Sequence, residues 1–453
     1  MDRPLSRRTV LRSATVAVSL GAGPLTGSTA TGRIATVSAP LSAESRSIDV
    51  EYALERVSER PERIRVIVTA APTSETTAMD GTLPADNEVE AMDGFDTSPE
   101  GVQWDGQTDT PSVTYTADIS RTDDSGRPIA AGTPEWALFR WQDIEPRWSY
   151  RHREDELSLQ ERATLATDTT GYVGSAYAYL GRYETERAGD VTLVVPESST
   201  ATGVADLYRR AGPGLRIGGR APTVVFVAPD PIAVSGRSIQ GVDGPGEAFV
   251  GAGSRIDSPD NAWIHEYVQT RQRYEITADM KWFDEASAEY YGALESLRQG
   301  HIDFESFHEY VTTDRAADSV LTEATDQRAH YFKGMRVLAA LDVEIRTASG
   351  DERTLAAVFR RMNASDETVS RTDFKRLVDE AAGASYDDWL DRYLTTSDVP
   401  AVPNAPWAFT NPTVTDTDDD GLSDVTERRH GTNPFVADTD GDGYTDAEEV
   451  RVG

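Results

Sequence analysis

The hydrophobic pattern divides the chain into a first stretch with a period of two residues and a later stretch with a helical period. Across residues 47–189, apolar and polar residues alternate in short runs such as 48–52 (IDVEY) and 63–68 (RIRVIV), with Gly, Pro, Asp and Ser between the runs. Alternation of this kind predicts antiparallel β structure with one buried face. Residues 73–110 are acidic and rich in Gly and Thr, so we expect a long surface loop there.

The later stretch begins with more strands and continues with helices. Further strands are predicted at residues 191–195 (VTLVV), 223–227 (TVVFV) and 247–252 (EAFVGA). A polar helix is predicted near residues 205–210, between the first two of these strands. After Pro259 the period lengthens to about 3.6 residues, and the pattern stays helical to about Tyr393. A sheet followed by a helical half predicts an α+β fold.

These changes of pattern divide the chain into successive parts. Residues 398–415 are rich in proline and show little periodicity, which predicts a linker. The expected parts are a leader at residues 1–30, a β-rich domain at 47–189, a domain with a mixed sheet and then a helical half at 190–397, the Pro-rich linker at 398–415 and a tail at 416–453.

The leader has the features of an export signal. Residues 6–12 (SRRTVLR) resemble the twin-arginine consensus, and residues 14–25 form an apolar run that glycines interrupt. This run is too short to span a membrane, and residues 28–30 (STA) are a candidate cleavage site, with an uncleaved N-terminal anchor as the alternative. No later segment reaches the roughly 20 apolar residues of a transmembrane helix. The mature chain is therefore expected outside the cell or on its surface, without such a helix.

The charge of the chain excludes one class of partner. Lys and Arg number 44 and Asp and Glu number 77, which gives a formal net charge of −33. Such a surface repels nucleic acid, so no nucleic-acid partner is expected. The 38% of hydrophobic residues and the eight Trp argue against disorder, and the acidic composition resembles that of proteins from halophilic archaea. The chain has no Cys and therefore neither disulfides nor thiolate metal ligands.

The tail contains one acidic pattern twice. Residues 416–427 and 438–449 each match a twelve-position calcium loop, with carboxylates at positions 1, 3, 5, 9 and 12 and Gly at position 6. The backbone carbonyl of position 7 completes the set, and the carboxylates of one loop repel one another unless a cation lies between them. Two calcium ions are therefore expected. The predicted ligands are Asp416, Asp418, Asp420, Leu422, Asp424 and Glu427 in the first loop and Asp438, Asp440, Asp442, Tyr444, Asp446 and Glu449 in the second.

The sequence around the loops distinguishes the type of repeat. An EF-hand needs a helix on both sides of its loop, but residues 411–412 (NP) precede the first loop and residues 431–434 (GTNP) lie between the two. The pattern resembles thrombospondin type 3 repeats, which implies calcium binding. A dockerin module, which repeats at a similar length, is the alternative, although its long apolar helices are missing here.

A candidate metal site begins in the predicted helix that contains the run WIHEYVQ, with Ser258 or Asp260 as its N-cap. Residues at i and i+4 share a helix face, which is why zinc peptidases place two His there and a Glu general base beside the first. Here His265 and Glu266 are present, and Gln269 stands where the second His is expected.

Two later segments extend this match to the gluzincin metallopeptidases. Residues 282–291 (WFDEASAEYY) resemble the second helix of that family, in which the Glu after an Asn or Asp is the third zinc ligand. Residues 331–334 (YFKG), which precede an apolar run, resemble the Tyr-x-Lys-Gly helix of aminopeptidase N-type enzymes. The resemblance covers about residues 191–394. It implies a thermolysin-like peptidase domain of the aminopeptidase N or glycyl aminopeptidase type, preceded by a β domain.

The resemblance implies a role for each matching residue. His265 and Glu285 correspond to zinc ligands. Glu266 corresponds to the base that takes a proton from the metal-bound water, and Tyr331 to the residue that stabilises the tetrahedral intermediate. Glu289, one turn after Glu285, is in a position to orient a ligand.

The implied ligand set is incomplete because Gln269 replaces a His, and an amide oxygen binds zinc more weakly than imidazole does. Whether the chain is an active enzyme therefore stays open. One hypothesis is a secreted zinc metallopeptidase with a weak metal site, which cleaves a peptide or protein as an endopeptidase or an aminopeptidase. The other is a non-catalytic relative with a binding or structural role at the cell surface. A third interpretation makes His265 an ordinary helix histidine and Glu285 and Glu289 part of a solvated face.

Overall fold

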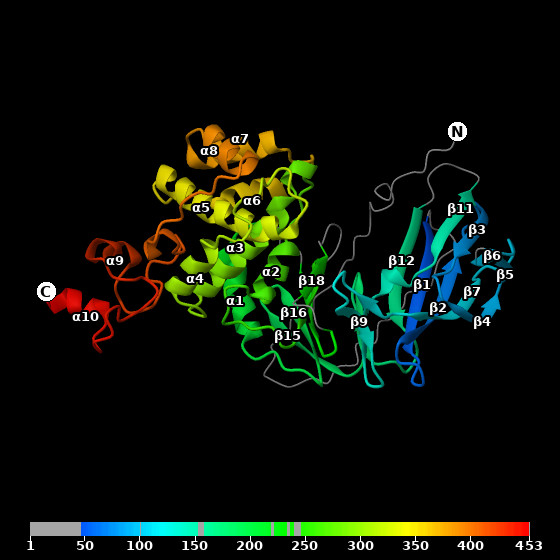
Figure 1. Cartoon of the computed structure of the whole chain (residues 1–453). Coiled ribbons are helices and arrows are strands. Elements are labelled where there is room, and N and C mark those ends of the chain that lie inside the picture. Colours follow the sequence, from blue (N-terminus) through cyan, green and yellow to red (C-terminus); the bar gives the residue numbers. More distant parts are fainter. Residues whose placement is uncertain are drawn as a thin grey trace.

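The computed structural model describes residues 47–99, 101–152, 158–218, 222–232, 236–239 and 246–452. The architecture is α+β, as predicted, with a β-rich part at one end, a helical half beside a second sheet, and the acidic tail at the other end (Figure 1). The predicted export signal at residues 1–30 lies outside the described residues.

The β-rich part consists mostly of antiparallel strands. Side chains along β1 (Ser47–Arg56) and β2 (Arg63–Ala71) alternate between buried and partly exposed, as the alternating sequence predicts. One sheet has the order β12-β1-β2-β7-β4, in which β1 and β12 are parallel. The other strands of this part are β3 (Thr76–Thr82), β4 (Glu88–Asp93), β5 (Phe95–Ser98), β6 (Gly101–Trp104), β7 (Ser112–Asp118), β8 (Arg121–Thr122), β9 (Pro128–Gly132), β10 (Ala137–Arg140), β11 (Arg147–His152), β12 (Ser158–Leu165), β13 (Gly171–Val173) and β14 (Tyr177–Leu180).

The prediction of a long surface loop at residues 73–110 is wrong. This segment contains β3, β4, β5 and β6, which pair with β7, β11 and one another. Every side chain of β4 is exposed, so backbone hydrogen bonds rather than side-chain burial hold this strand in place. Its sequence, EVEAMD, alternates only briefly within an acidic segment, so the pattern gives little sign of the strand.

The second sheet has the order β15-β16-β17-β19-β18, with β16, β17 and β19 parallel and an antiparallel strand at each edge. Its strands are β15 (Tyr183–Ala188), β16 (Val191–Pro196), β17 (Thr223–Ala228), β18 (Gly236–Ile239) and β19 (Gly246–Gly251). Val225 and Val227 pack on the side of the helices, whereas Val224 and Phe226 pack with β10 and β14. β15 lies before the expected domain boundary at 189/190 but pairs with β16, so the sheet begins at Tyr183.

A buried carboxylate fastens this sheet to the β-rich part. Glu247 on β19 is 1% exposed. Its Oε2 accepts hydrogen bonds from the backbone N–H groups of Ala176 at 3.0 Å and Tyr177 at 2.9 Å, and its Oε1 accepts one from the Ser175 hydroxyl at 2.8 Å. Charge-assisted bonds of this kind satisfy the buried carboxylate and hold the loop before β14 against the sheet.

The helical half covers one face of the second sheet (Figure 1). Its longest helix, α3, packs against α2, α4 and α5. The helices are α1 (Val204–Leu215), α2 (Ala262–Gln269), α3 (Trp282–Arg298), α4 (Phe304–Val311), α5 (Met335–Ser349), α6 (Leu355–Asn363), α7 (Arg371–Ala382) and α8 (Asp387–Thr395), with a π-helical turn η4 (Ala329–Gly334) before α5. Within the described residues, every helix is too short or too polar to cross a membrane.

The predicted linker at residues 398–415 is mostly irregular, but it packs against the helical half. Phe409 is fully buried, and its ring lies 4.9 Å from that of Phe307 between centroids. The Arg298 side chain donates to the carbonyl oxygens of Phe409 at 2.9 Å and Thr410 at 3.2 Å. These contacts hold the start of the tail against α3 and α4. The tail itself contains α9 (Asp424–His430) and α10 (Asp446–Val452).

Candidate zinc and calcium sites

Helix α2 begins at a buried cap. Asn261, rather than the predicted Ser258 or Asp260, is the N-cap, because it directly precedes the first helical residue. Its side-chain oxygen accepts from the backbone N–H groups of Trp263 at 3.1 Å and Ile264 at 3.4 Å. Satisfying these N–H groups fixes the start of the helix, and with it the directions of the side chains one turn later.

The i, i+4 pair on α2 faces a carboxylate on α3. Nε2 of His265 lies 3.3 Å from Oε2 of Glu285. The amide nitrogen of Gln269 lies 3.0 Å from the same Nε2 and donates to the same Oε2 at 2.8 Å. The structure thus brings the three residues that were predicted as zinc ligands to one point.

The second ring nitrogen of His265 is also held by α3. Nδ1 lies 2.9 Å from Oε2 of Glu289, whose other oxygen accepts from the hydroxyl of Tyr310 on α4. Burial alone lowers the pKa of His265, but the hydrogen bonds to Glu285 and Glu289 outweigh burial and raise the pKa to about 10. Glu289 therefore orients the imidazole so that Nε2 faces Gln269 and Glu285.

Glu266 lies on the face of α2 toward β18. It is 6% exposed, and among the described residues its Oε2 has no hydrogen-bond partner. Burial raises the pKa of Glu266 to about 7. A Cβ on Gly236 would lie 2.6 Å from Cγ of Glu266, so a glycine is what lets this strand approach the helix. A carboxyl group with such a pKa can accept and return a proton near neutral pH.

Tyr331 completes the cluster from the side of the π-helical turn. Its ring stacks on that of His265, with centroids 5.6 Å apart and planes 11° apart. Burial and the neighbouring Glu285 carboxylate, to which the hydroxyl bonds, raise the pKa of Tyr331 above its ordinary value. The hydroxyl therefore keeps its proton and stays a hydrogen-bond donor at neutral pH.

The two residues at the end of the YFKG turn have structural roles. Gly334 allows close packing, because a Cβ there would lie 2.6 Å from Cβ of Ala286 on α3. The buried Lys333 donates to the carbonyl oxygens of Ser319 at 2.6 Å and Thr396 at 2.7 Å. Both contacts fix the turn that carries Tyr331 against the helices.

Sequence reasoning missed one residue of this cluster, Ser238 on β18. Its hydroxyl donates to Oε1 of Gln269 at 2.7 Å, and its hydrogen bonding also lowers the pKa of Glu266. Ser238 belongs to no motif. Only its position in the fold identifies it: Ser238 lies on the edge strand β18, which pairs antiparallel with β19 and so lies beside α2.

The three predicted ligands fit a zinc ion in spacing. Zn²⁺ binds imidazole and carboxylate at about 2.0–2.2 Å, so ligands at the corners of a tetrahedron are about 3.3 Å apart. The distances between the atoms of His265, Gln269 and Glu285 are 2.8, 3.0 and 3.3 Å. The amide must present its oxygen, since the NH₂ group of Gln269 has no lone pair to offer. Rotation of the amide about its terminal bond by half a turn exchanges the two atoms and makes the donor set suitable.

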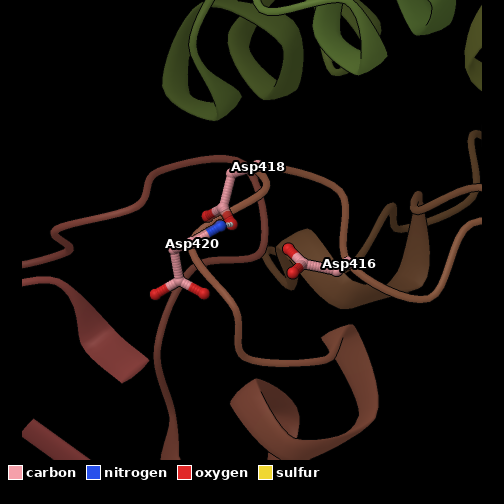
Figure 2. A group of neighbouring side chains, drawn as sticks. All are labelled: Asp416, Asp418 and Asp420. Atoms are coloured by element: carbon pink, nitrogen blue, oxygen red, sulfur yellow. Dashed lines mark hydrogen bonds between the residues drawn. The ribbon is translucent and has the colours of Figure 1, made fainter. Parts of the chain in front are cut away.

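Each acidic run of the tail folds into a loop with converging carboxylates. One carboxylate oxygen from each of three Asp residues lies within 4.8 Å of the others in each loop. The first group is Asp416, Asp418 and Asp420, which extend from one loop in Figure 2, and the second is Asp438, Asp440 and Asp442. The predicted ligands at positions 1, 3 and 5 therefore meet in both loops.

The next positions turn the backbone around these carboxylates. Gly421 and Gly443 at position 6 have φ of +96° and +100°, which L side chains rarely adopt. At position 7, the N–H of Leu422 donates to Oδ1 of Asp420 at 2.6 Å, and the N–H of Tyr444 donates to Oδ1 of Asp442 at 3.0 Å. The two loops thus share one backbone arrangement.

The carboxylates at position 9 close the loops. Asp424 accepts from the backbone N–H and the hydroxyl of Thr417, both at 2.8 Å. Asp446 accepts from the same two groups of Thr439 at 3.0 and 2.7 Å. Both oxygens of each carboxylate have donors, so this position holds the loop together.

Position 12 differs between the loops. Glu427 is fully buried, and neither of its oxygens has a hydrogen-bond partner among the described residues. Burial and the nearby Asp418 raise the pKa of Glu427 to about 8, and burial raises that of Asp418 to about 6. Glu449 is exposed. Clustered hard oxygens with an unpartnered buried carboxylate beside them suit Ca²⁺.

Comparison with solved structures gives the fold a family context. The chain is similar to an aminopeptidase N family protein from Idiomarina loihiensis, with a TM-score of 0.54 and 12% identity over 79% of this chain and 77% of that one. An M1 zinc metallopeptidase from Deinococcus radiodurans gives a TM-score of 0.47 and 16% identity over 79% and 94%. At 12% identity the first similarity shows a shared fold, as the gluzincin resemblance implied.

Comparison with sequence families concerns the tail. The family described as "Bacterial TSP3 repeat" matches residues 416–437 and 438–453, so the tail consists of repeats of this calcium-binding type. The predicted repeat type is therefore confirmed, and the dockerin alternative is set aside. Among curated proteins none matches the chain.

Proposed function

We propose that this chain, which has the fold of the aminopeptidase N family, is an exported, calcium-binding metallopeptidase whose zinc site is weakened by Gln269. The observation that carries the proposal is the meeting of His265, Gln269 and Glu285 at one point. Glu266 and Tyr331 lie beside this point in positions that suit catalysis of peptide hydrolysis.

The residues of the site divide the chemistry between them. A zinc ion bound by His265, Gln269 and Glu285 would supply the positive charge that acidifies water and polarises a peptide carbonyl. Glu266 has an unpartnered oxygen to accept a proton from the attacking water and return it to the leaving amine. The protonated hydroxyl of Tyr331 donates a hydrogen bond to the oxyanion of the tetrahedral intermediate.

The expected activity is low because of one ligand. A neutral amide is a weaker ligand than imidazole for this ion, and loss of one imidazole is expected to lower zinc affinity by about two orders of magnitude or more. Peptide hydrolysis should therefore depend on added zinc over a wide concentration range. The substrate is expected to be a peptide, with endopeptidase and aminopeptidase modes both open.

The test is hydrolysis of a mixed peptide library by calcium-loaded protein at increasing zinc concentrations. We expect slow, zinc-dependent cleavage that Glu266→Gln abolishes and that Gln269→His accelerates at low zinc. Glu305→Gln, an exposed change on α4, is the matched control and should leave cleavage unchanged. Native protein that cleaves nothing at any zinc concentration, beside an active Gln269→His variant, would contradict the proposal.

One observation favours a second function, a non-catalytic binding protein on the same fold. The amide nitrogen of Gln269 donates to Glu285, and Nε2 of His265 lies 3.3 Å from the same carboxylate oxygen, so the three side chains are partners of one another. A chain that binds peptides at this site without cutting them would retain library peptides in pull-down experiments with and without zinc. Peptide hydrolysis by the Gln269→His variant alone, with none by the native chain, supports this alternative.

We also propose that the tail binds two calcium ions outside the cell or at its surface. The paired Asp clusters and the buried, unpartnered Glu427 support the binding. The acidic composition suits solubility in concentrated salt, and the twin-arginine-like leader supports export. Fusion of residues 1–40 to a reporter tests the route: replacement of Arg7 and Arg8 by Lys should stop export.

A further inference from the structure

We propose that Ser238 is a positioning residue that lets Gln269 turn its amide oxygen toward the metal. This inference rests on the zinc site proposed above and names the residue that makes a glutamine usable there. The contact that carries it is the hydrogen bond of 2.7 Å between the Ser238 hydroxyl and Oε1 of Gln269.

As placed, the amide is oriented for a site without an ion. Its oxygen accepts from Ser238, and its nitrogen faces His265 Nε2 and donates to Glu285. Within the described part of the chain, these three residues make the hydrogen bonds of the Gln269 side chain. A half-turn of the amide therefore exchanges the atom that faces Ser238 on β18 and the atom that faces His265 on α2 and Glu285 on α3.

A hydroxyl can serve both orientations because it is a donor and an acceptor. When the amide oxygen faces His265 and Glu285, the NH₂ group of Gln269 faces Ser238 and donates to its Oγ. The turned amide thus loses no hydrogen bond on the strand side.

The close approach of β18 to α2 keeps Ser238 within reach of Gln269. Gly236, two residues earlier on β18, allows this approach, because a Cβ there would lie 2.6 Å from Cγ of Glu266.

The experiment is calorimetric zinc titration of the full chain with the tail loops saturated by calcium. Ser238→Ala should weaken zinc binding about tenfold or more, in the range seen when residues that orient metal ligands are lost. Ser238→Thr keeps a hydroxyl and should stay within about threefold of the native chain. Thermal unfolding of metal-free protein checks that both variants are folded.

A second background separates positioning from general packing. In the Gln269→His chain no amide has to turn, so adding Ser238→Ala should change zinc affinity by less than about twofold. Cobalt in place of zinc gives a second readout. The visible absorption bands of bound cobalt should shift on Ser238→Ala in the native chain, which has Gln269, and not in the Gln269→His chain.

Three results would overturn the inference. Equal losses in both backgrounds would assign Ser238 to packing, and no loss in the native background would remove it from the site. Absence of zinc binding in the native chain, with binding restored by Gln269→His, would instead overturn the proposed metal site and the inference together. The first two results leave the proposed function intact, so the two failures are distinguishable.

Discussion

The amide nitrogen of Gln269 donates a hydrogen bond of 2.8 Å to Oε2 of Glu285. It also lies 3.0 Å from Nε2 of His265. The hydrogen bond bridges α2 and Glu285 on α3, beside the contact of His265 with the same carboxylate oxygen. This bridge and the His265–Glu285 pair together hold the set assembled although one histidine is replaced.

Replacing the neutral Gln269 side chain by a charged one should destabilise the metal-free protein. Gln269→Glu puts a second carboxylate where an N–H now donates to Glu285, and like charges at this distance in a buried site repel. We expect metal-free protein to unfold at a lower temperature, by about 1–3 kcal/mol of unfolding free energy. Zinc should restore most of the loss. Calorimetric unfolding with and without zinc measures both, and an unchanged melting temperature in metal-free protein would contradict the bridge.

Glu289 gives a prediction about the orientation of His265. Because its carboxylate holds Nδ1 at 2.9 Å, Glu289→Gln should lower zinc affinity about 10–100-fold while the fold persists. The measurement is competition for zinc with a chelator of known affinity, with the exposed Glu305→Gln as control. Equal affinities of the two variants would show that Glu289 does not orient the imidazole.

The calcium-free tail should lose stability as pH rises. The pKa of Glu427 is raised from its ordinary 4.5 to about 8 and that of Asp418 from 3.8 to about 6, so the folded tail holds protons more tightly than the unfolded tail. Their contribution is complete below about pH 4, and it is lost as pH rises through 6 and then 8. The protection factors of the tail amides against hydrogen exchange, which correct for the intrinsic pH dependence of exchange, should therefore fall over this range without calcium.

Calcium should reverse this pH dependence, because the ion binds the deprotonated carboxylates. Glu427→Gln removes the higher of the two pKa values and should flatten the profile between pH 6 and 8. Protection factors that are independent of pH in the calcium-free native tail would contradict the assignment of Glu427 to the first site.

A carboxylate of the first calcium loop contacts the second repeat. Oδ2 of Asp420 accepts from the N–H of Ala447, which lies at the start of α10 in the second repeat, at 2.9 Å. Asp420→Asn should therefore weaken calcium binding at both loops, the second by several-fold. Asp442→Asn is the matched control, since Asp442 holds the same loop position and should affect the second loop alone. Calcium titration followed by NMR resolves the two loops, and identical patterns for the variants would exclude this link.

Much of the site could be predicted from the sequence because its residues obey helical spacing. His265 and Gln269 are four residues apart on one helix, and Glu285 and Glu289 are four apart on another, so each pair shares a face. Tyr331 followed from a resemblance, and its stacking on His265 shows that the three segments do meet. The calcium loops could be predicted because the same pattern occurs twice in the same register.

The remaining features depend on contacts that no local pattern encodes. Ser238 reaches Gln269 through strand pairing, and its strand is too short to show periodicity. The strand β4 has no buried face, and its place depends on pairing with β7. Phe409 lies in a proline-rich segment whose sequence predicts a linker. Its burial depends on contacts with Phe307 and Arg298 from the helical half. Tertiary contacts decide all three features.

The most direct test of the central claim is anomalous diffraction at the zinc edge from crystals grown with calcium and zinc. The account predicts one peak in the helical half, about 2 Å from Nε2 of His265 and from carboxylate and amide oxygens of Glu285 and Gln269. Zinc found only in the acidic loops of the tail, with the Gln269 amide nitrogen still bonded to Glu285, would contradict it.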